Sequence, residues 1–336
     1  MESLWVSLLV IAVYFSTCEE GVNLSDPLVS VIIPLFNKEQ WVTQTLLSVY
    51  SQSYRNWECI IVDDGSTDGS VNRINVFIKS HPGNWKIINQ ANSGQIRARN
   101  LGIENASGEF IAFLDADDLW LPKKLELQVK THLSNPTIGL SLTSYAIFNK
   151  DQKNGFRVVT CRDSNKMIFG WLSLTGFGGL IESTGFISKA TLDRFDRYSE
   201  SFSMTSGLDL SLRIVSELEV IVLREPLVLY RLSPGQFHKQ EDILIKDLEN
   251  MTTKYAGSPE ALAHLRKLHS SYLYWSKCRS LGARYFAFSA FRAIFLLRGR
   301  ELPMLYFLLS RNLLAMFRGF RKQRMIRQYL DSSGER

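Results

Sequence analysis

Two groups of aspartates follow directly on hydrophobic runs, and they are the residues of this chain best suited to chemistry. The string E-F-I-A-F-L-D-A-D-D-L-W-L-P places Asp115, Asp117 and Asp118 after one run, and E-C-I-I-V-D-D-G-S-T-D-G-S places Asp63 and Asp64 after another. Carboxylates are costly to bury without a partner, and hard cations prefer oxygen ligands. Three acids at one strand end therefore indicate a bound cation.

The hydrophobic runs alternate with helical patterns in the first half of the chain. Residues 29–33 are mostly β-branched and are closed by Pro34, as expected of a strand buried on both faces of a parallel sheet. The order predicts an α/β fold with a doubly wound sheet, in which ligands bind beyond the carboxyl ends of the strands. Both acid groups lie at those ends. The expected strands are residues 29–33, 59–62, 85–88 and 110–114, and the expected helices include residues 95–105 and one that begins at Pro122.

The second half of the chain is less regular. Gly, Ser and Asn interrupt residues 149–179, which predicts loops there. Beyond them we expect a strand at residues 181–188, a helix at 208–218, a hairpin-like pair at 219–232 around Glu225-Pro226, and helices throughout after residue 240.

Composition limits the possible classes of protein. With 336 residues, 45% of them hydrophobic, the chain can bury a sizeable core. The net charge of +6 comes from the arginine-rich C-terminal segment, because the first half is rich in acids. The four cysteines form no CxxC pair, which argues against a zinc cluster or a disulfide framework and favours a reducing compartment.

An apolar stretch lies near the N-terminus, at residues 4–15. It is shorter than the roughly 20 residues needed to span a bilayer. Glu2 also stands where a signal peptide would carry a basic residue. A membrane anchor or signal, a start-site extension and an extra docked helix are the interpretations that stay open for this stretch.

Three strings occur in the order, spacing and strand context of one known family. They are V-S-V-I-I-P-L-F-N-K, V-D-D-G-S-T-D-G-S and N-S-G-Q-I-R-A-R-N-L-G-I-E-N-A-S-G-E-F-I-A-F-L-D-A-D-D. Over roughly residues 29–140 the chain resembles the family 2 glycosyltransferases, which have a GT-A fold. The resemblance implies a mixed, mostly parallel sheet with helices on both faces. It also implies transfer of a sugar from a nucleotide-diphosphate sugar to an acceptor hydroxyl, with inversion at the anomeric carbon.

The resemblance also suggests a plan of domains. Residues 28–240 would form the GT-A domain, with residues 28–140 as the nucleotide-sugar half and residues 141–240 as the acceptor half. Residues 1–27 precede this domain as an apolar extension. Residues 241–336 follow it as a basic, aromatic, helical segment.

The site residues take their roles in donor binding from the resemblance. Adjacent like charges destabilise each other without a counter-ion, so a purely structural role is disfavoured for Asp115 and Asp117. Arg97 and Arg99 also suit a solvated helix face, and Asp63 also suits a turn cap. By the resemblance, Pro34 and Phe36 line the base pocket and Asp64 accepts a hydrogen bond from the base. Asp115 faces the ribose in the same picture. Asp117 with Asp118 holds Mg²⁺ or Mn²⁺ against the phosphates, and Arg99 or Arg97 adds positive charge.

The general base that the family uses is missing from its usual place. The family carries it in a Glu-Asp pair, which aligns with Ser206 and Gly207, and these residues cannot take a proton. Three explanations stay open: a shifted helix start brings Asp209 into the site, Glu182 or Glu200 substitutes, or the chain is a weak or inactive transferase. We favour Asp209, whose structural alternative is a first-turn acid that complements the helix dipole.

A second departure from the family lies at Ser233, where a histidine that helps to hold the metal or the diphosphate is often found. His238 replaces it only if the loop folds back, and a lone loop histidine is more often solvent-exposed. The acid cluster supplies metal ligands in either case.

Aromatic and aliphatic residues are interleaved with arginines across residues 282–330. This composition suits a helix in an anionic membrane interface. It suits equally well a helix pair packed on the catalytic domain, with arginine stems covering apolar surface. Nucleic acid is not expected as a partner, because no reader motif accompanies the basic residues.

The sequence therefore predicts a metal-dependent, inverting glycosyltransferase that uses a nucleotide-diphosphate sugar and a saccharide or lipid-linked acceptor. We expect it at the cytoplasmic face of the plasma membrane, in the synthesis of a bacterial surface polysaccharide or glycolipid. Two alternatives are a donor-binding scaffold that has lost its base and a sugar nucleotidylyltransferase. The latter is disfavoured because its Gly-rich phosphate loop is missing near the N-terminus.

Overall fold

The computed structural model describes residues 26–149, 157–159, 182–232 and 241–266, apart from 260 and 264. The apolar stretch at residues 4–15, most of the expected loops at 149–179, Ser233 with His238, and the arginine-rich segment at 282–330 lie outside these described residues. Among the residues described, no helix is long and apolar enough to cross a bilayer.

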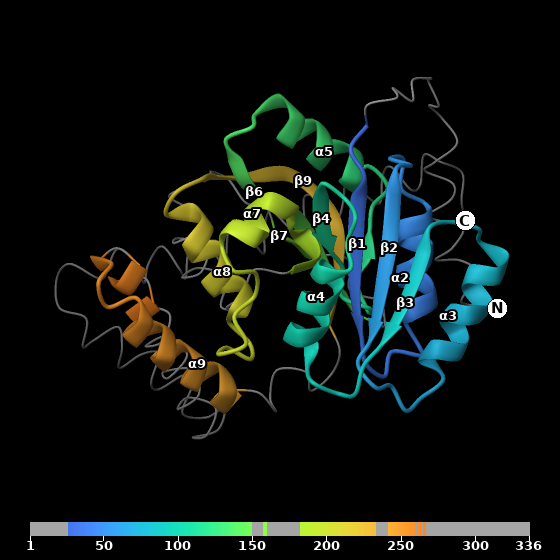
Figure 1. Ribbon diagram of the computed structural model, residues 1–336, viewed down its shortest axis with the longest axis horizontal. Helices are drawn as coiled ribbons and strands as arrows, with labels where there is room; N and C mark the ends of the chain where they lie inside the picture. Colours follow the sequence, from blue (N-terminus) through green and yellow to red (C-terminus); the bar gives the residue numbers. More distant parts are fainter. Residues whose placement is uncertain are drawn as a thin grey trace.

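A nine-stranded mixed sheet forms the centre of the described protein (Figure 1). Its path runs β3-β2-β1-β4-β8-β6-β9-β5, and β7 pairs with β6 off this path. The first four strands along the path pair in parallel, which confirms the doubly wound half that the sequence predicts. These strands are β1 (Val29–Leu35), β2 (Trp57–Asp63), β3 (Trp85–Asn89) and β4 (Phe110–Phe113).

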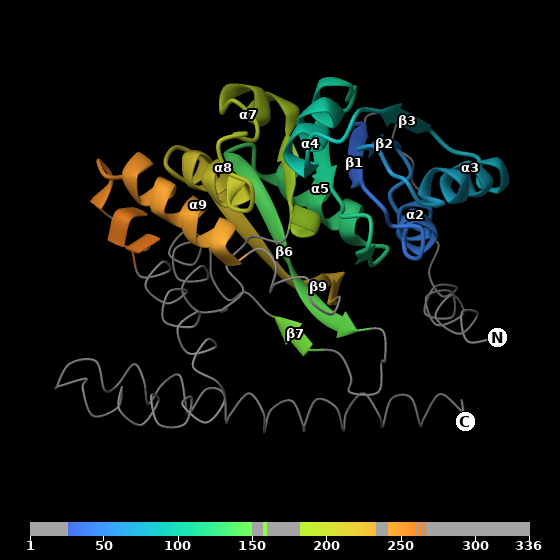
Figure 2. The same ribbon diagram turned by 90° about the horizontal axis from the view of Figure 1, so that it is seen from below.

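Helices cover both faces of this parallel half, as the fold class requires. The chain moves from β1 through β2 to β3 in one direction and then returns to the other side of β1. Right-handed crossovers therefore place the first two helices on one face and the third on the opposite face, and Figure 2 shows α2 and α4 on opposite sides of β1 and β2. The helices are α2 (Val42–Tyr50), α3 (Ser70–Ser80), α4 (Gln95–Glu104) and α5 (Lys124–Ser134).

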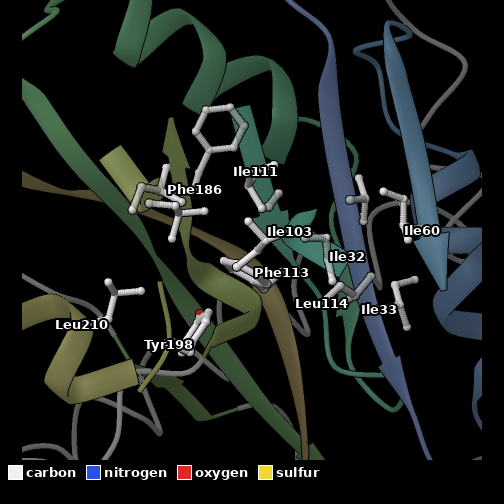
Figure 3. Packing of buried hydrophobic residues seen from close by; sticks show 14 of the residues in the cluster. Ile32, Ile33, Ile60, Ile103, Ile111, Phe113, Leu114, Phe186, Tyr198 and Leu210 are labelled. Atoms are coloured by element: carbon white, nitrogen blue, oxygen red, sulfur yellow. The ribbon is translucent and has the colours of Figure 1, made fainter. Parts of the chain in front are cut away.

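The core lies where α4 meets β1. A Cβ placed on Gly102 of α4 would lie 2.4 Å from Cγ2 of Ile32, so only glycine allows this close approach of helix and strand. Figure 3 shows Ile32 of β1 and Ile103 of α4 in the same buried cluster as Phe113. β1 and β2 are buried along almost their whole length, in agreement with continuous apolar runs covered on both faces.

The second half adds longer and partly antiparallel strands. β6 pairs with β9 in parallel and with β8 antiparallel, and β8 joins this half to β4. The elements are β5 (Leu119–Trp120), β6 (Ile138–Asn149), β7 (Arg157–Val159), the 3₁₀ helix η1 (Glu182–Thr184), β8 (Phe186–Ser188), α7 (Lys189–Arg194), α8 (Ser206–Val215), β9 (Glu219–Leu232) and α9 (Glu241–Lys254).

Two local predictions in this half are wrong. The strand expected at residues 181–188 begins as a 3₁₀ turn and is extended only from Phe186. The hairpin expected around Pro226 is instead one strand, β9, whose pairing with β6 changes register on either side of Ser144. A proline is tolerated in a strand at such an irregularity, so the chain passes Pro226 without turning back.

A buried histidine connects α5 to the sheet. The His132 ring lies against Phe110 and Phe186, with ring centroids 5.3 and 5.1 Å apart, and its Nε2 lies 3.0 Å from the Ser141 hydroxyl. Burial lowers the pKa of His132 to about 4. The folded protein therefore keeps this imidazole neutral at pH values where an unfolded chain would begin to protonate it.

We predict that the free energy of unfolding falls as the pH is lowered from about 6.5 to about 4, because the unfolded chain then binds a proton on His132 that the folded chain does not. This group contributes a loss of up to about 3 kcal/mol. Urea denaturation across this pH range should show a shallower pH dependence for His132→Phe. Phe186→Leu, which loosens the same cluster without removing an ionisable group, should lower the stability and keep the slope. An unchanged slope in His132→Phe would contradict the prediction.

Candidate functional site

The two acid groups emerge at the same edge of the sheet. In the parallel register Asp63 pairs with Leu35, and Phe113 pairs with Ile32 on the other side of β1. The residues that follow β2 and β4 therefore flank the carboxyl end of β1. This is the arrangement that the order of the strands predicts.

Asp64 organises the loop between β3 and α4. One carboxylate oxygen accepts hydrogen bonds from Gln90 Nε2 and the Ser93 backbone N–H, both at 2.7 Å, and the other accepts from the Gly94 N–H at 2.9 Å. The side chain is buried. Asp63 accepts from the Ser66 backbone N–H, as expected of a turn cap. A carboxylate has about four acceptor positions, so Asp64 retains one position beyond these three bonds.

The segment after β1 faces the same edge. Pro34 is half-buried and Phe36 is 44% exposed, which is unusual for a large apolar ring. Asn37, with a φ of 50°, accepts a hydrogen bond from the Thr67 backbone N–H at 2.8 Å. The loops after β1 and β2 are thus joined by a hydrogen bond from the residue that follows Phe36.

The three aspartates after β4 have different surroundings. Asp115 is the most accessible, with 29% of its side chain exposed. Asp117 is almost enclosed and forms an ion pair with Lys38, which follows β1. Asp118 is fully buried and accepts hydrogen bonds from the Ser183 hydroxyl at 2.6 Å and the Arg231 backbone N–H at 2.9 Å.

Asp118 therefore has a position different from that expected of a metal ligand. Burial, together with the charges of Asp117 and Asp115, raises the pKa of Asp118. Its two oxygens join the 3₁₀ turn η1 and the end of β9 to the acid cluster. Asp117 and Asp115 are the two acids of this string whose carboxylates reach cationic side chains instead.

Two cations at this edge were not assigned from the sequence. Lys38 contacts Asp117, and Arg231 at the end of β9 donates from Nε to the Asp117 carbonyl at 2.7 Å. The Arg231 guanidinium lies over the rings of Trp41 and Phe148, at 4.2 and 4.3 Å from their centroids. In the sequence Arg231 is a charged residue near the end of a mainly apolar strand, and buried pairing explains its presence there.

Arg99 and Arg97, neighbours on α4, differ sharply. Arg99 is buried and donates to Asp115 at 2.7 Å, with Glu182 at 4.0 Å. Burial alone would lower the pKa of Arg99, but Asp115 and Glu182 raise it, so the guanidinium stays charged. Arg97 lies on the solvated face and pairs with Glu200 at 2.9 Å, as its structural alternative predicts.

The structure does not bring Asp209 to the acid cluster. Its carboxylate is fully buried and accepts from Arg213 Nε at 3.0 Å, from Lys254 and from the Tyr255 hydroxyl at 2.9 Å. Arg213 lies on α8, Lys254 is the last residue of α9 and Tyr255 directly follows it, so Asp209 connects the two helices. Both oxygens are engaged and the side chain has no route to solvent, which are poor conditions for a general base.

The comparisons with known proteins agree with this geometry. Residues 30–177 match the model of glycosyl transferase family 2. The match covers less than half of the chain and agrees with the resemblance seen in the sequence. Among curated relatives, the chain is 42% identical over 130 residues to an uncharacterized glycosyltransferase of Rickettsia conorii. It is 38% identical over 128 residues to the Escherichia coli UDP-Glc:alpha-D-GlcNAc-diphosphoundecaprenol beta-1,3-glucosyltransferase WfgD.

These matches cover 39% and 38% of this chain but only 21% and 49% of the two relatives. Solved structures of the same fold include S. aureus TarS in complex with UDP-GlcNAc, with a TM-score of 0.57, 19% identity, and coverage of 85% of this chain and 81% of that one. The mannosyltransferase PcManGT from Pyrobaculum calidifontis, in complex with GDP-Man and Mn²⁺, has a TM-score of 0.57, 16% identity and 93% coverage of both chains. The GT-A fold predicted from the sequence is confirmed.

The carboxylates that the structure describes at this edge are too few to enclose a divalent cation by themselves. Among the described residues, no group of three or more His, Cys, Asp or Glu side chains forms a ready cage. Mg²⁺ needs only one or two carboxylates when phosphates and water complete its shell. Asp117 offers such a carboxylate, which is paired with the Lys38 ammonium in this structure.

We predict that Asp118→Ala lowers the stability of the protein much more than Asp117→Ala does. Asp118→Ala leaves the Ser183 hydroxyl and the Arg231 N–H buried without acceptors, at a cost of about 1–3 kcal/mol for each. Asp117→Ala removes a carboxylate whose only side-chain partner among the described residues is Lys38, so it should leave the stability within about 1 kcal/mol of wild type. Urea denaturation of the two variants tests this. Equal losses would contradict the division between a structural and a ligand-facing acid.

Proposed function

We propose that this chain is a metal-dependent, inverting glycosyltransferase that uses a nucleotide-diphosphate sugar. The observation that carries the proposal is the meeting of Asp64, Asp115 and Asp117 at the carboxyl edge of a family 2 domain. Ligands of open α/β sheets bind at this edge. A nucleotide diphosphate has a base, a ribose and two phosphates, and the three acids lie on either side of the strand end that these parts would cross.

The donor contacts follow from the surroundings of each residue. The exposed ring of Phe36, beside Pro34, offers a face on which a base can stack. The remaining acceptor position of Asp64 suits a base N–H. Asp115, oriented by Arg99, is accessible enough to accept from a ribose hydroxyl. Two of the fold relatives were solved with UDP-GlcNAc and GDP-Man, which supports a nucleotide-sugar donor.

Asp117 is the residue that would hold Mg²⁺ or Mn²⁺, with Asp118 behind it as a support for the loop. The cation, when bound, would supply Lewis-acid stabilisation of the departing diphosphate. Lys38 would have to exchange its contact with Asp117 for one with the phosphates, which an ammonium on a flexible stem can do. Arg231 fixes the Asp117 backbone while this exchange takes place.

The acceptor is a saccharide or a lipid-linked saccharide in this proposal. The name of the Escherichia coli relative includes a diphosphoundecaprenol acceptor, and that protein is 38% identical to this chain over 128 residues. We assign residues 28–140 to donor binding and residues 141–240 to acceptor binding. The basic segment within residues 241–336 would contact the inner face of the plasma membrane, where a bacterial polysaccharide or glycolipid is built.

A second candidate is a donor-binding scaffold without turnover. The observation that favours it is the pair Ser206 and Gly207, where the family carries a Glu-Asp pair. Both candidates require nucleotide binding, and only the transferase requires turnover.

Calorimetric titration with UDP-GlcNAc, UDP-Glc and GDP-Man, with and without Mn²⁺, tests nucleotide binding, which both candidates require. We expect Mn²⁺ to tighten the binding of one donor at least tenfold, or about 1.4 kcal/mol. Asp117→Asn should abolish this increment because it removes the charged ligand. Arg97→Gln, which alters a solvated ion pair on α4, is the matched control and should retain it. A Mn²⁺ effect that survives Asp117→Asn would refute the ligand assignment.

A further inference from the structure

Glu182 and Gly207 lie against each other although they belong to different elements. A Cβ placed on Gly207, in the first turn of α8, would lie 2.2 Å from Glu182 Oε1 and 3.0 Å from its Cδ. The Glu182 carboxylate thus fills the space into which a side chain at position 207 would project. Gly257, by contrast, has nothing within 4 Å of such a Cβ.

Glu182 is fixed to the acid cluster by its neighbours. Ser183, the next residue, donates from its hydroxyl to Asp118 and accepts from the Asp115 backbone N–H at 3.1 Å. Arg99 lies between the Asp115 and Glu182 carboxylates, at 2.7 and 4.0 Å respectively. The 3₁₀ turn η1 therefore brings Glu182 to the same edge of the sheet as the proposed donor residues.

The surroundings of Glu182 leave its carboxylate available. Among the cations of the described residues, Arg99 is the one that lies within 4.0 Å of it, and this contact is too long for a direct hydrogen bond. The side chain keeps 17% exposure. Burial raises the pKa of Glu182, Arg99 opposes this, and Asp115 adds to it. By contrast, Asp209 is fully buried and engaged at both oxygens.

We propose that Glu182 is the general base of the transfer reaction and takes the place of the acid that is missing at position 207. This inference rests on the proposed function. Glu182 would accept the proton of the acceptor hydroxyl while that oxygen forms its bond to the anomeric carbon of the donor. The bond from the anomeric carbon to the diphosphate oxygen breaks, and the diphosphate leaves with the electron pair. The proton on Glu182 then passes to solvent.

The contact between Glu182 and Gly207 also predicts how the base could be transferred from position 182 to position 207. A small cavity of about 30 Å³ is lined by Glu182, Gly207, Tyr198 and Leu210, among others. Removing the Glu182 carboxylate would enlarge this space beside Gly207. An aspartate at position 207 would then fit where it now collides, and its carboxylate would come from α8 instead of η1.

The experiment compares Glu182→Gln, Glu182→Ala, Gly207→Asp, the double variant Glu182→Ala/Gly207→Asp, and Asp209→Asn. Turnover is followed as release of nucleoside diphosphate from the donor that wild type binds most tightly with Mn²⁺, with water as the acceptor. Donor affinity is measured by calorimetry on the same preparations. Urea midpoints show whether each variant is folded.

We expect Glu182→Gln to lower kcat about 10²- to 10⁴-fold, which is the usual contribution of a general base, while donor affinity stays within about threefold. Gly207→Asp alone should be destabilised by the collision with Glu182. The kcat of the double variant should be at least about tenfold higher than that of Glu182→Ala, because the aspartate restores a carboxylate at this place. A merely structural role of Glu182 would give no such recovery.

Other outcomes overturn the inference or its premise separately. If Glu182→Gln keeps its kcat, or if Asp209→Asn loses kcat with donor binding intact while the double variant shows no recovery, Glu182 is not the base. Tight donor binding by the wild type without any turnover would also contradict the inference and favour the scaffold. Absence of nucleotide binding in the wild type would instead remove the proposed function.

Discussion

The concentration of negative charge at one edge of the sheet is the constraint on which the rest of this structure depends. Asp115, Asp117, Asp118 and Glu182 are all largely buried there. Carboxylates in such a place require cations or hydrogen-bond donors close by. These partners come from widely separated parts of the chain: Lys38 after β1, Arg99 on α4, Ser183 on η1 and Arg231 on β9.

This need for compensation explains the path of the second half of the chain. β9 runs parallel to β6 and continues past Pro226 until Arg231 reaches the Asp117 carbonyl and the Asp118 carboxylate. A hairpin at Pro226 would have ended the strand before that contact. The long strand therefore closes the site from the side opposite to β2, and Trp41 and Phe148 hold the guanidinium in place through its flat faces.

The acids also divide into structural acids and ion-pairing acids by their partners. Asp64 and Asp118 accept hydrogen bonds that hold loops, whereas Asp115 and Asp117 form ion pairs with Arg99 and Lys38. A bound diphosphate with its cation could replace Lys38 without disturbing the hydrogen bonds of the structural acids. Rigid support behind an exchangeable first contact is what a site that binds and releases a charged ligand requires.

The sequence predicts those features that depend on local periodicity and on the order of strands. The parallel order of β1 to β4 and the meeting of Asp64 with Asp115 and Asp117 follow from apolar runs that end in acids, because parallel strands end at a common edge. The roles of Lys38 and Arg231 depend on contacts across the fold, which no local pattern records. The burial of Lys124 could not be predicted from the sequence for the same reason. Charged residues on a helix normally face solvent, but Lys124 is fully buried over the Trp120 ring and donates a hydrogen bond to Gln128.

The same limitation applies to the pair Ser206 and Gly207, which in the sequence alone suggests a lost activity. In the folded chain the absence of an acid at position 207 and the presence of one at position 182 depend on each other. The Glu182 carboxylate occupies the volume that a side chain on Gly207 would need. Either residue constrains the other: a larger residue at 207 would displace Glu182, and a smaller one at 182 would leave a cavity beside α8. The missing acid is thus an argument for inactivity only if no other carboxylate fills its position, and here one does.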